Sequence, residues 1–194
     1  MGVIKHPNQR VAVFIDTQNL YHSAKNLYKT KVNFGAVVQA AVGKRQLVRA
    51  LSYVVNTESG EESAFFEALE KIGIEIKTKD LQIFYGGAKK ADWDVGMAVD
   101  AIKLSKKVDA IVLATGDGDF IPLVEYLQNQ GCQVEVITFG RSASGRLREV
   151  VDDFIDMDEN PSEFLIGSRN GKRKTGPSLK RHIQKIVGTD TDTI

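Results

Sequence analysis

Two aspartates separated by one glycine, Asp117 and Asp119, lie a few residues after the apolar run from Val108 to Leu113. Two carboxylates this close together repel each other unless a cation or a proton lies between them. The pair stands between a strand-like run and a helix that carries Pro122 in its first turn, and open α/β sheets keep their sites at such junctions. The spacing favours a cation site, and a plain helix N-cap is the alternative for Asp117.

Two further aspartates occupy comparable places. Asp16 ends the first apolar run of the chain, and Asn19 follows it within one turn of the next helix. Asp94 shares one helical stripe with the alanines four and seven positions further on, so we expect its carboxylate to point inward. An ordinary capped helix start is the alternative for Asp16 and Asn19.

Carboxylate oxygens that converge on one point bind Mg²⁺ or Mn²⁺, because these ions favour hard oxygen ligands. The three histidines are scattered along the chain, so we expect no zinc site. A divalent ion held by carboxylates orients a water, lowers the pKa of that water and neutralises charge on a phosphate, which suits phosphodiester hydrolysis. The pattern is compatible with one ion or two. The candidate ligands are Asp16, Asp94, Asp117 and Asp119.

The elements that must position these acids alternate between strands and helices. Connections of a dozen or more residues predict parallel strand pairing with helices on both faces. We therefore expect an α/β fold of three layers around a central, mostly parallel sheet, in which the acids meet where the strand order reverses. The expected strands are 10–16, 46–55, 74–77, 81–85, 108–114, 133–139 and 154–157, and the expected helices are 17–28, 34–42, 58–72, 93–105, 122–130 and 145–151.

Length and charge divide the chain into two parts. With 194 residues and 42% hydrophobic content, it is long enough for one well-buried domain, which we expect at residues 8–160. Up to residue 160 the chain carries 19 Lys and Arg against 22 Asp and Glu, whereas residues 161–194 carry seven against three. We expect residues 161–194 to form a basic, flexible tail with a short helix at 178–187.

Basic residues in this tail and in two loops are candidates for contacts with RNA. Cations without balancing acids release counterions when they bind a nucleic acid. Plain solvation is the alternative for both the loops and the tail. The candidates are Lys89, Lys90, Arg141, Lys172, Arg173 and Lys174.

Several classes of protein are excluded by the sequence. No apolar stretch approaches the roughly 18 residues that span a bilayer, and the first residues lack the apolar region of a signal peptide. Cys132 is the only cysteine, which excludes an intrachain disulfide and fits a packed thiol. We therefore expect a cytoplasmic protein without a membrane partner, and the sequence is compatible with a homo-oligomer.

Three blocks of the chain resemble NYN domains of the LabA-like type, which are relatives of the PIN-domain ribonucleases. The blocks are Val13–Leu20, Lys90–Asp100 and Thr115–Phe120. A fourth segment, Ser144–Asp156, resembles the closing segment of the family, so that the resemblance covers about residues 10–158. One departure is Thr17-Gln18, where many relatives carry smaller residues.

The resemblance implies a PIN-like, Rossmann-like fold and an endoribonuclease that depends on Mg²⁺ or Mn²⁺. It implies that Asp16, Asp94, Asp117 and Asp119 hold the metal, that Asn19 orients a water or a ligand, and that Thr115 supports the acids. A non-catalytic LabA-like module that binds RNA or a protein partner is the main alternative. A phosphatase is a weaker one, because the chain lacks a glycine-rich phosphate cradle and a recognisable nucleophile.

Overall fold

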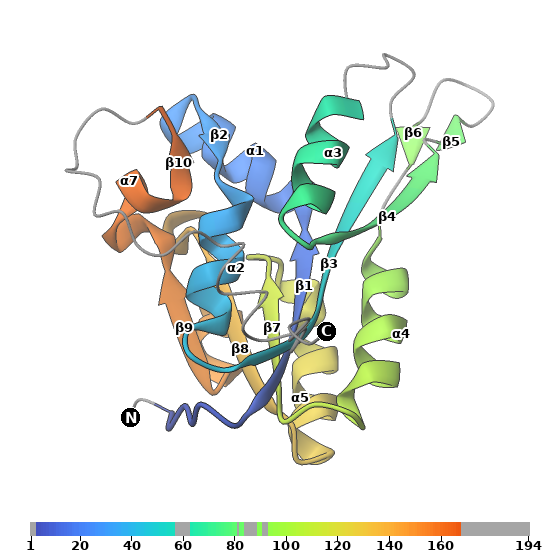
Figure 1. The fold of residues 1–194 in the computed structure, drawn as a ribbon, viewed down its shortest axis with the longest axis vertical. Coiled ribbons are helices and arrows are strands. Elements are labelled where there is room, and N and C mark those ends of the chain that lie inside the picture. The colour runs from blue at the N-terminus through green and yellow to red at the C-terminus, as the bar shows by residue number, and fades with distance from the viewer. Residues whose placement is uncertain (1–2, 57–62, 81, 84–88, 91–92, 168–194) are drawn as a thin grey trace, which may run out of the picture.

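The computed structural model describes residues 3–56, 63–80, 82–83, 89–90 and 93–167 of the chain (Figure 1). The strands of its central sheet are β1 (Arg10–Asp16), β3 (Gln46–Asn56), β4 (Glu75–Asp80), β7 (Ala110–Ala114), β8 (Gln133–Thr138) and β9 (Asp153–Asp156). Every neighbouring pair is parallel. The strand order is β4-β3-β1-β7-β8-β9, so it reverses between β1 and β7. The expected α/β fold around a parallel sheet is confirmed.

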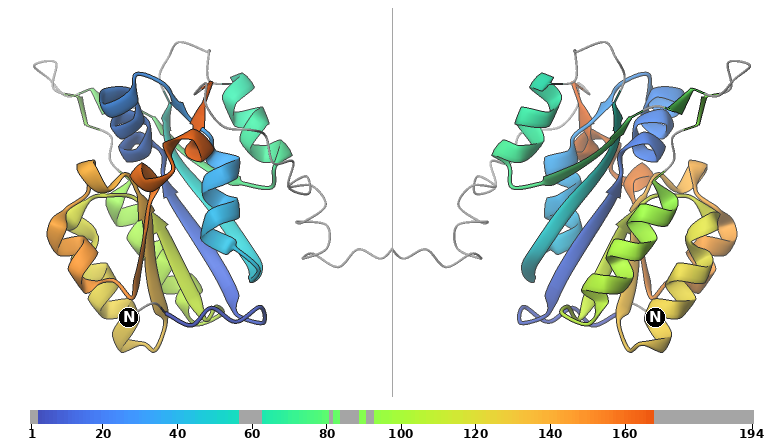
Figure 2. Two further views of the ribbon diagram at one scale, coloured as in Figure 1. Left: turned by 90° about the vertical axis from the view of Figure 1, so that its left-hand side faces the viewer. Right: turned by 90° about the vertical axis from the view of Figure 1, so that its right-hand side faces the viewer.

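Helices cover both faces of this sheet (Figure 2). One face carries α1 (Thr17–Tyr28), α2 (Phe34–Val42) and α3 (Ser63–Lys71). The other face carries α4 (Asp94–Ser105), α5 (Ile121–Asn129) and α6 (Gly145–Val150). The molecule therefore has three layers and two hydrophobic cores, one on each side of the sheet. Among the described residues, no helix is both long and apolar enough to cross a membrane.

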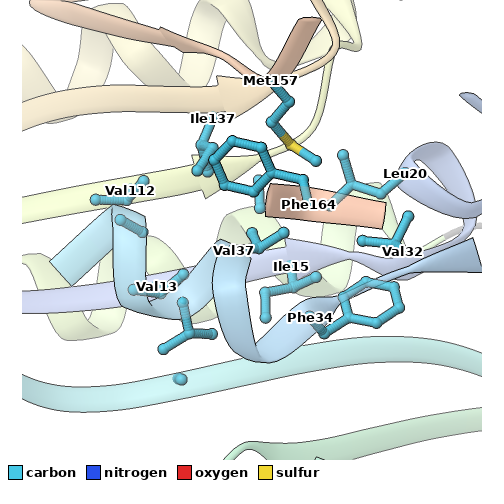
Figure 3. Close-up of a cluster of buried hydrophobic side chains, with 14 of the residues drawn as sticks. Val13, Ile15, Leu20, Val32, Phe34, Val37, Val112, Ile137, Met157 and Phe164 are labelled. Atoms are coloured by element: carbon cyan, nitrogen blue, oxygen red, sulfur yellow. The ribbon is translucent and has the colours of Figure 1, made fainter. Parts of the chain in front are cut away.

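Strand β1 shows why the sheet is buried on both faces. Its residues between the two ends are all fully buried, and successive side chains point to opposite faces. Val11, Val13 and Ile15 join one core, whereas Ala12 and Phe14 join the other. Figure 3 shows the first of these cores, the one with Val13 and Ile15, where β1 packs with Leu20 of the next helix and with Val37 and Phe164 from later segments.

The packed structure continues beyond the expected domain boundary at residue 160. The short helix α7 (Pro161–Phe164) leads into β10 (Leu165–Ile166), which pairs antiparallel with β2 (Lys31–Val32). Phe164 and Leu165 are buried in the first core. These residues lie in the segment expected to be tail, and they belong to the fold because their apolar side chains complete that core.

Short elements account for the other differences from the expected boundaries. Lys89 and Lys90, expected in a loop, form β6 (Lys89–Lys90), which pairs with β5 (Gln82–Ile83). The expected helix 122–130 is α5, and a 3₁₀ turn, η1 (Gly118–Phe120), precedes it. Two more 3₁₀ turns, η2 (Gly140–Ser142) and η3 (Met157–Glu159), follow β8 and β9. The expected helix 178–187 and the start of the expected helix 58–72 lie outside the described residues.

Buried titratable groups away from the carboxyl ends of the strands have structural roles. Arg45 and Glu135 form a buried ion pair, with 3.0 Å between Nη2 and Oε2, and Lys5 Nζ lies 2.7 Å from the same oxygen. Cys132 is buried, and burial raises the pKa of its thiol to about 11. The thiol therefore packs in the core, as expected.

Candidate active site

The acidic residues gather at the carboxyl ends of β1 and β7. Ile15 of β1 pairs with Ala114 of β7, so Asp16, the last residue of β1, lies next to Thr115, the first residue after β7. This edge, at the top of the sheet in Figure 1, is the switch point where the strand order reverses. Ligands of open α/β sheets bind at such a point.

Asp16 is both a helix cap and part of the acidic edge. Its Oδ1 accepts a hydrogen bond of 3.0 Å from the backbone N–H of Asn19, which makes it the N-cap of α1. Its Oδ2 accepts a hydrogen bond of 3.1 Å from the hydroxyl of Thr115. The capping interpretation is thus correct, and it leaves a place for a site because a carboxylate has two oxygens with several lone pairs.

Thr115 and Asn19 join α1 to the loop after β7. The fully buried hydroxyl of Thr115 also accepts a hydrogen bond of 3.2 Å from the backbone N–H of Asp117. The side-chain oxygen of Asn19 accepts one of 2.9 Å from the backbone N–H of Gly116. These bonds fix the loop that carries Asp117 relative to Asp16.

Asp117 and Asp119 point to different places. The Oδ1 of Asp117 accepts a hydrogen bond of 2.9 Å from the backbone N–H of Asp119, so Asp117 caps η1. Asp119 is exposed, and it lines a second pocket together with Pro122, Glu125 and Arg146. The structure therefore separates the two acids that the sequence places side by side.

One pocket of about 220 Å³ brings three of the four expected acids together. None of the lining residues in the described part of the chain is basic. The lining residues are Asp16, Gln18, Asn19, Tyr53, Trp93, Asp94 and Asp117. Tyr53 of β3 and Trp93, which directly precedes Asp94, were not among the expected site residues.

The charges around this pocket favour the binding of a cation. Burial raises the pKa of the Asp16 carboxyl, and the negative charge of Asp117 raises it further, while the hydrogen bonds from Asn19 and Thr115 lower it. Asp94 is half-buried in the first turn of α4. Since like charges that share a pocket repel, a cation between them would be stabilising.

Asp100 has a different role, on the far side of Tyr53. Its carboxylate accepts a hydrogen bond of 2.9 Å from the Tyr53 hydroxyl and forms an ion pair with Lys77. Asp94 and Asp100 are six positions apart on α4, about 240° around the helix, so they face different centres.

The residues of the pocket fit a divalent ion in their chemistry. They supply three carboxylates of the kind that Mg²⁺ and Mn²⁺ prefer. Within the described ranges, however, no group of three or more His, Cys, Asp or Glu side chains lies close enough to hold a metal as it stands. The acids line a common pocket without forming a closed ligand set.

Among the expected RNA contacts, Arg141 is the one whose side chain the structure describes. Arg141 forms an ion pair with Asp158, at 3.2 Å between Nη2 and Oδ1, and lies over the ring of Tyr28 at 4.8 Å. The charge of Arg141 is therefore partly neutralised within the fold. For Lys89 and Lys90 the structure describes the backbone only, and Lys172, Arg173 and Lys174 lie outside the described residues.

The fold and the site define the class of protein: a three-layer α/β domain with acidic residues at the switch point of its sheet. Comparison with known families gives its membership: the model of the NYN domain matches residues 10–158, and the chain belongs to this family. The LabA-like resemblance found in the sequence is thereby confirmed.

Two relatives support the assignment. The chain is 26% identical over 157 residues to the low amplitude and bright protein LabA of Synechococcus elongatus, covering 77% of this chain and 84% of LabA. A crystal structure of a protein of unknown function from Vibrio parahaemolyticus superposes with a TM-score of 0.76 at 28% identity. That superposition covers 84% of this chain and all of the other.

Proposed function

We propose that this protein is an endoribonuclease that uses Mg²⁺ or Mn²⁺ to hydrolyse phosphodiester bonds of RNA in the pocket between β1, β7 and α4. The observation that carries the proposal is the convergence of three carboxylates, each from a different part of the fold, on one pocket whose described lining holds no basic residue. The raised pKa of Asp16 supports it, because burial and the charge of Asp117 disfavour an ionised carboxylate there, and a bound cation would offset both effects.

In this proposal Asp16, Asp94 and Asp117 would hold the ion. When bound, the ion would supply a polarised water and compensate negative charge on the phosphate. The hydroxyl of Thr115 bonds both to the Oδ2 of Asp16 and to the backbone N–H of Asp117, and so holds these two residues together. Asn19 connects α1 to the same loop through its hydrogen bond with Gly116. Asp119, which lies in the other pocket, has no direct part in holding the ion in this arrangement.

The activity test compares single-stranded and structured RNA in Mg²⁺ and in Mn²⁺. We expect Asp16→Asn, Asp94→Asn and Asp117→Asn each to lower the cleavage rate by about a hundredfold or more, since several kcal/mol of transition-state stabilisation depend on the ion. Asp119→Asn is the matched control from the same loop and should change the rate far less. Equal activity of the Asp117→Asn variant and the wild type would refute the proposal.

A second measurement is independent of catalysis. A ligand that binds the native state alone raises the unfolding temperature. Mg²⁺ should therefore raise the unfolding temperature of the wild type, and Asp16→Asn and Asp117→Asn should abolish this increase.

A non-catalytic RNA- or protein-binding module is the second candidate function. The observation in its favour is that the described acids form no closed ligand set. It predicts no cleavage and no effect of Mg²⁺ on the unfolding temperature, with RNA or partner binding retained in the aspartate variants.

A further inference from the structure

Trp93, the only tryptophan of the chain, forms a wall of the acidic pocket beside Asp94. It is half-buried, and three contacts fix its position. Its indole Nε1 donates a hydrogen bond of 2.9 Å to the backbone oxygen of Val54. Its ring meets the ring of Tyr53 edge-on, with centroids 5.3 Å apart and an angle of 64° between the planes.

The third contact is with the helix that Trp93 precedes. A Cβ atom at Gly96 would lie 2.6 Å from Cε3 and 2.9 Å from Cζ3 of the indole. Such distances are too short for any side chain, so only glycine at this position allows the ring to lie against the first turn of α4.

Tyr53, which contacts Trp93, is itself buried and hydrogen-bonded. Tyr53 is 1% exposed, and its hydroxyl donates to the carboxylate of Asp100, which also pairs with Lys77. Burial and this hydrogen bond raise the pKa of Tyr53, so the hydroxyl stays protonated and the contact persists at neutral pH. The indole ring is thus held at the pocket by a network that spans β3, β4 and α4.

The surroundings of Trp93 combine an aromatic surface with a cation. The ammonium of Lys79 lies over the indole ring, 5.9 Å from its centre, and the indole itself lines the pocket of the three carboxylates. An aromatic ring beside a cation suits a nucleotide, because the ring stacks on the base and the cation attracts the phosphate backbone.

From this geometry we infer that Trp93 is the stacking platform for one nucleobase of single-stranded RNA, next to the phosphate that the acids address. The inference rests on the proposed function and adds a substrate requirement. Proteins read RNA bases mainly in single strands, where unstacked bases are free to stack on aromatic side chains. The enzyme should therefore need an unpaired nucleotide at its site and tolerate any of the four bases.

The first test uses the fluorescence of Trp93 itself, since no other tryptophan contributes. The full chain is titrated in Mg²⁺ with a single-stranded RNA hexamer, with the same hexamer in a duplex, and with a hexamer of abasic nucleotides. We expect saturable quenching by the single strand and little quenching by the duplex or the abasic chain. Equal quenching by all three would contradict stacking.

The second test uses substitutions and a labelled hexamer. Trp93→Leu should weaken binding about 5- to 150-fold, the range that corresponds to about 1–3 kcal/mol per stacked base, and it should raise KM more than it lowers kcat. Gly96→Ala should also weaken RNA binding, because its methyl group displaces the indole. The control is Tyr126→Leu, an exposed aromatic of α5 that lines neither pocket.

The outcomes separate this inference from the proposed function. If a folded Trp93→Leu variant cleaves RNA with an unchanged KM, the stacking role of Trp93 is refuted and the proposed nuclease activity stands. If single-stranded RNA quenches the fluorescence but the wild type does not cleave it, the stacking role of Trp93 stands and the proposed nuclease activity is refuted. If Trp93→Leu does not fold, Trp93→Phe, which retains a ring but loses the bond to Val54, must still lower affinity.

Discussion

At the scale of single residues, Asp16 shows that a structural and a functional interpretation of one side chain are compatible. One carboxylate oxygen caps α1 and the other accepts from Thr115. The same contacts that order the helix therefore hold the carboxylate at the edge of the pocket. The energetic consequence is a raised pKa, caused first by burial and then by the charge of Asp117.

This raised pKa makes the stability of the metal-free protein depend on pH. A carboxyl group whose pKa is higher in the folded than in the unfolded state stabilises the fold fully below its ordinary pKa, and this contribution is lost as the pH rises through the folded-state value. The stability advantage of the wild type over Asp16→Asn should therefore shrink as the pH rises above about 4.

Urea denaturation in EDTA between pH 3.5 and pH 8 measures this difference. Asparagine caps helices as well as aspartate does, so Asp16→Asn retains the cap of α1. A difference in unfolding free energy that stays constant over the whole pH range would contradict the expectation.

Two buried threonines at the ends of neighbouring strands give a matched pair. Thr115 bonds to Asp16 and to the backbone of Asp117, whereas the buried hydroxyl of Thr138 has no hydrogen-bond partner in the described part of the chain. Thr115→Val should cost about 1–3 kcal/mol, because it leaves buried groups unsatisfied. Thr138→Val should be neutral or stabilising. Chemical denaturation of both variants measures the contrast, and equal destabilisation would contradict it.

At the scale of elements, the turn after β8 is built around the carboxylate of Asp156. Asp156 accepts hydrogen bonds of 2.9 Å from the backbone N–H groups of Gly140 and Asp158, and its other oxygen lies 3.3 Å from Arg148. A Cβ atom at Gly140 would lie 2.1 Å from this carboxylate. Glycine is therefore required here by close approach.

Gly140→Ala should accordingly lower the unfolding free energy by about 1–3 kcal/mol, the usual cost of overpacking. Gly145→Ala is the control, because a Cβ atom there meets nothing within 4 Å and alanine favours the first turn of α6. Thermal unfolding should separate the two variants by several degrees. A Gly140→Ala variant as stable as Gly145→Ala would refute the role assigned to this contact.

At the scale of the whole molecule, charge and packing divide the C-terminal segment at different places. Residues 161–194 carry the excess of positive charge, but Phe164 and Leu165 lie in the first core. The boundary that matters for stability therefore comes after Ile166. All the basic residues of this segment lie beyond that boundary.

Two truncations distinguish these contributions. Removal of residues 168–194 should leave the unfolding temperature unchanged and should weaken RNA binding with a shallower salt dependence, by about 0.7 in the logarithmic slope for each phosphate that the tail neutralises. Removal of residues 161–194 should in addition lower the unfolding temperature. Filter binding at several salt concentrations and thermal unfolding measure both. An unchanged salt slope after the shorter truncation would exclude a role of the tail in RNA binding.

Local sequence patterns were enough to predict the central sheet with its covering helices and most of the acids that line the pocket. The apolar run of β1 and the alternation of strands and helices are local signals, and the carboxyl ends of parallel strands must share one edge. The convergence of Asp16, Asp94 and Asp117 followed from these signals together. The pairing of β2 with β10 did not, because two-residue strands carry no periodicity.

By itself, then, the sequence determined the parallel α/β class, the positions of the acids at the ends of elements, and the family. Only the tertiary structure decided which side chains share a surface. It placed Asp117 and Asp119 in different pockets, paired Arg141 with Asp158, and brought the ring of Tyr53 against that of Trp93. The physical reason is that periodicity reports how a residue lies on its own element, whereas contacts between residues far apart in the chain depend on how the elements pack.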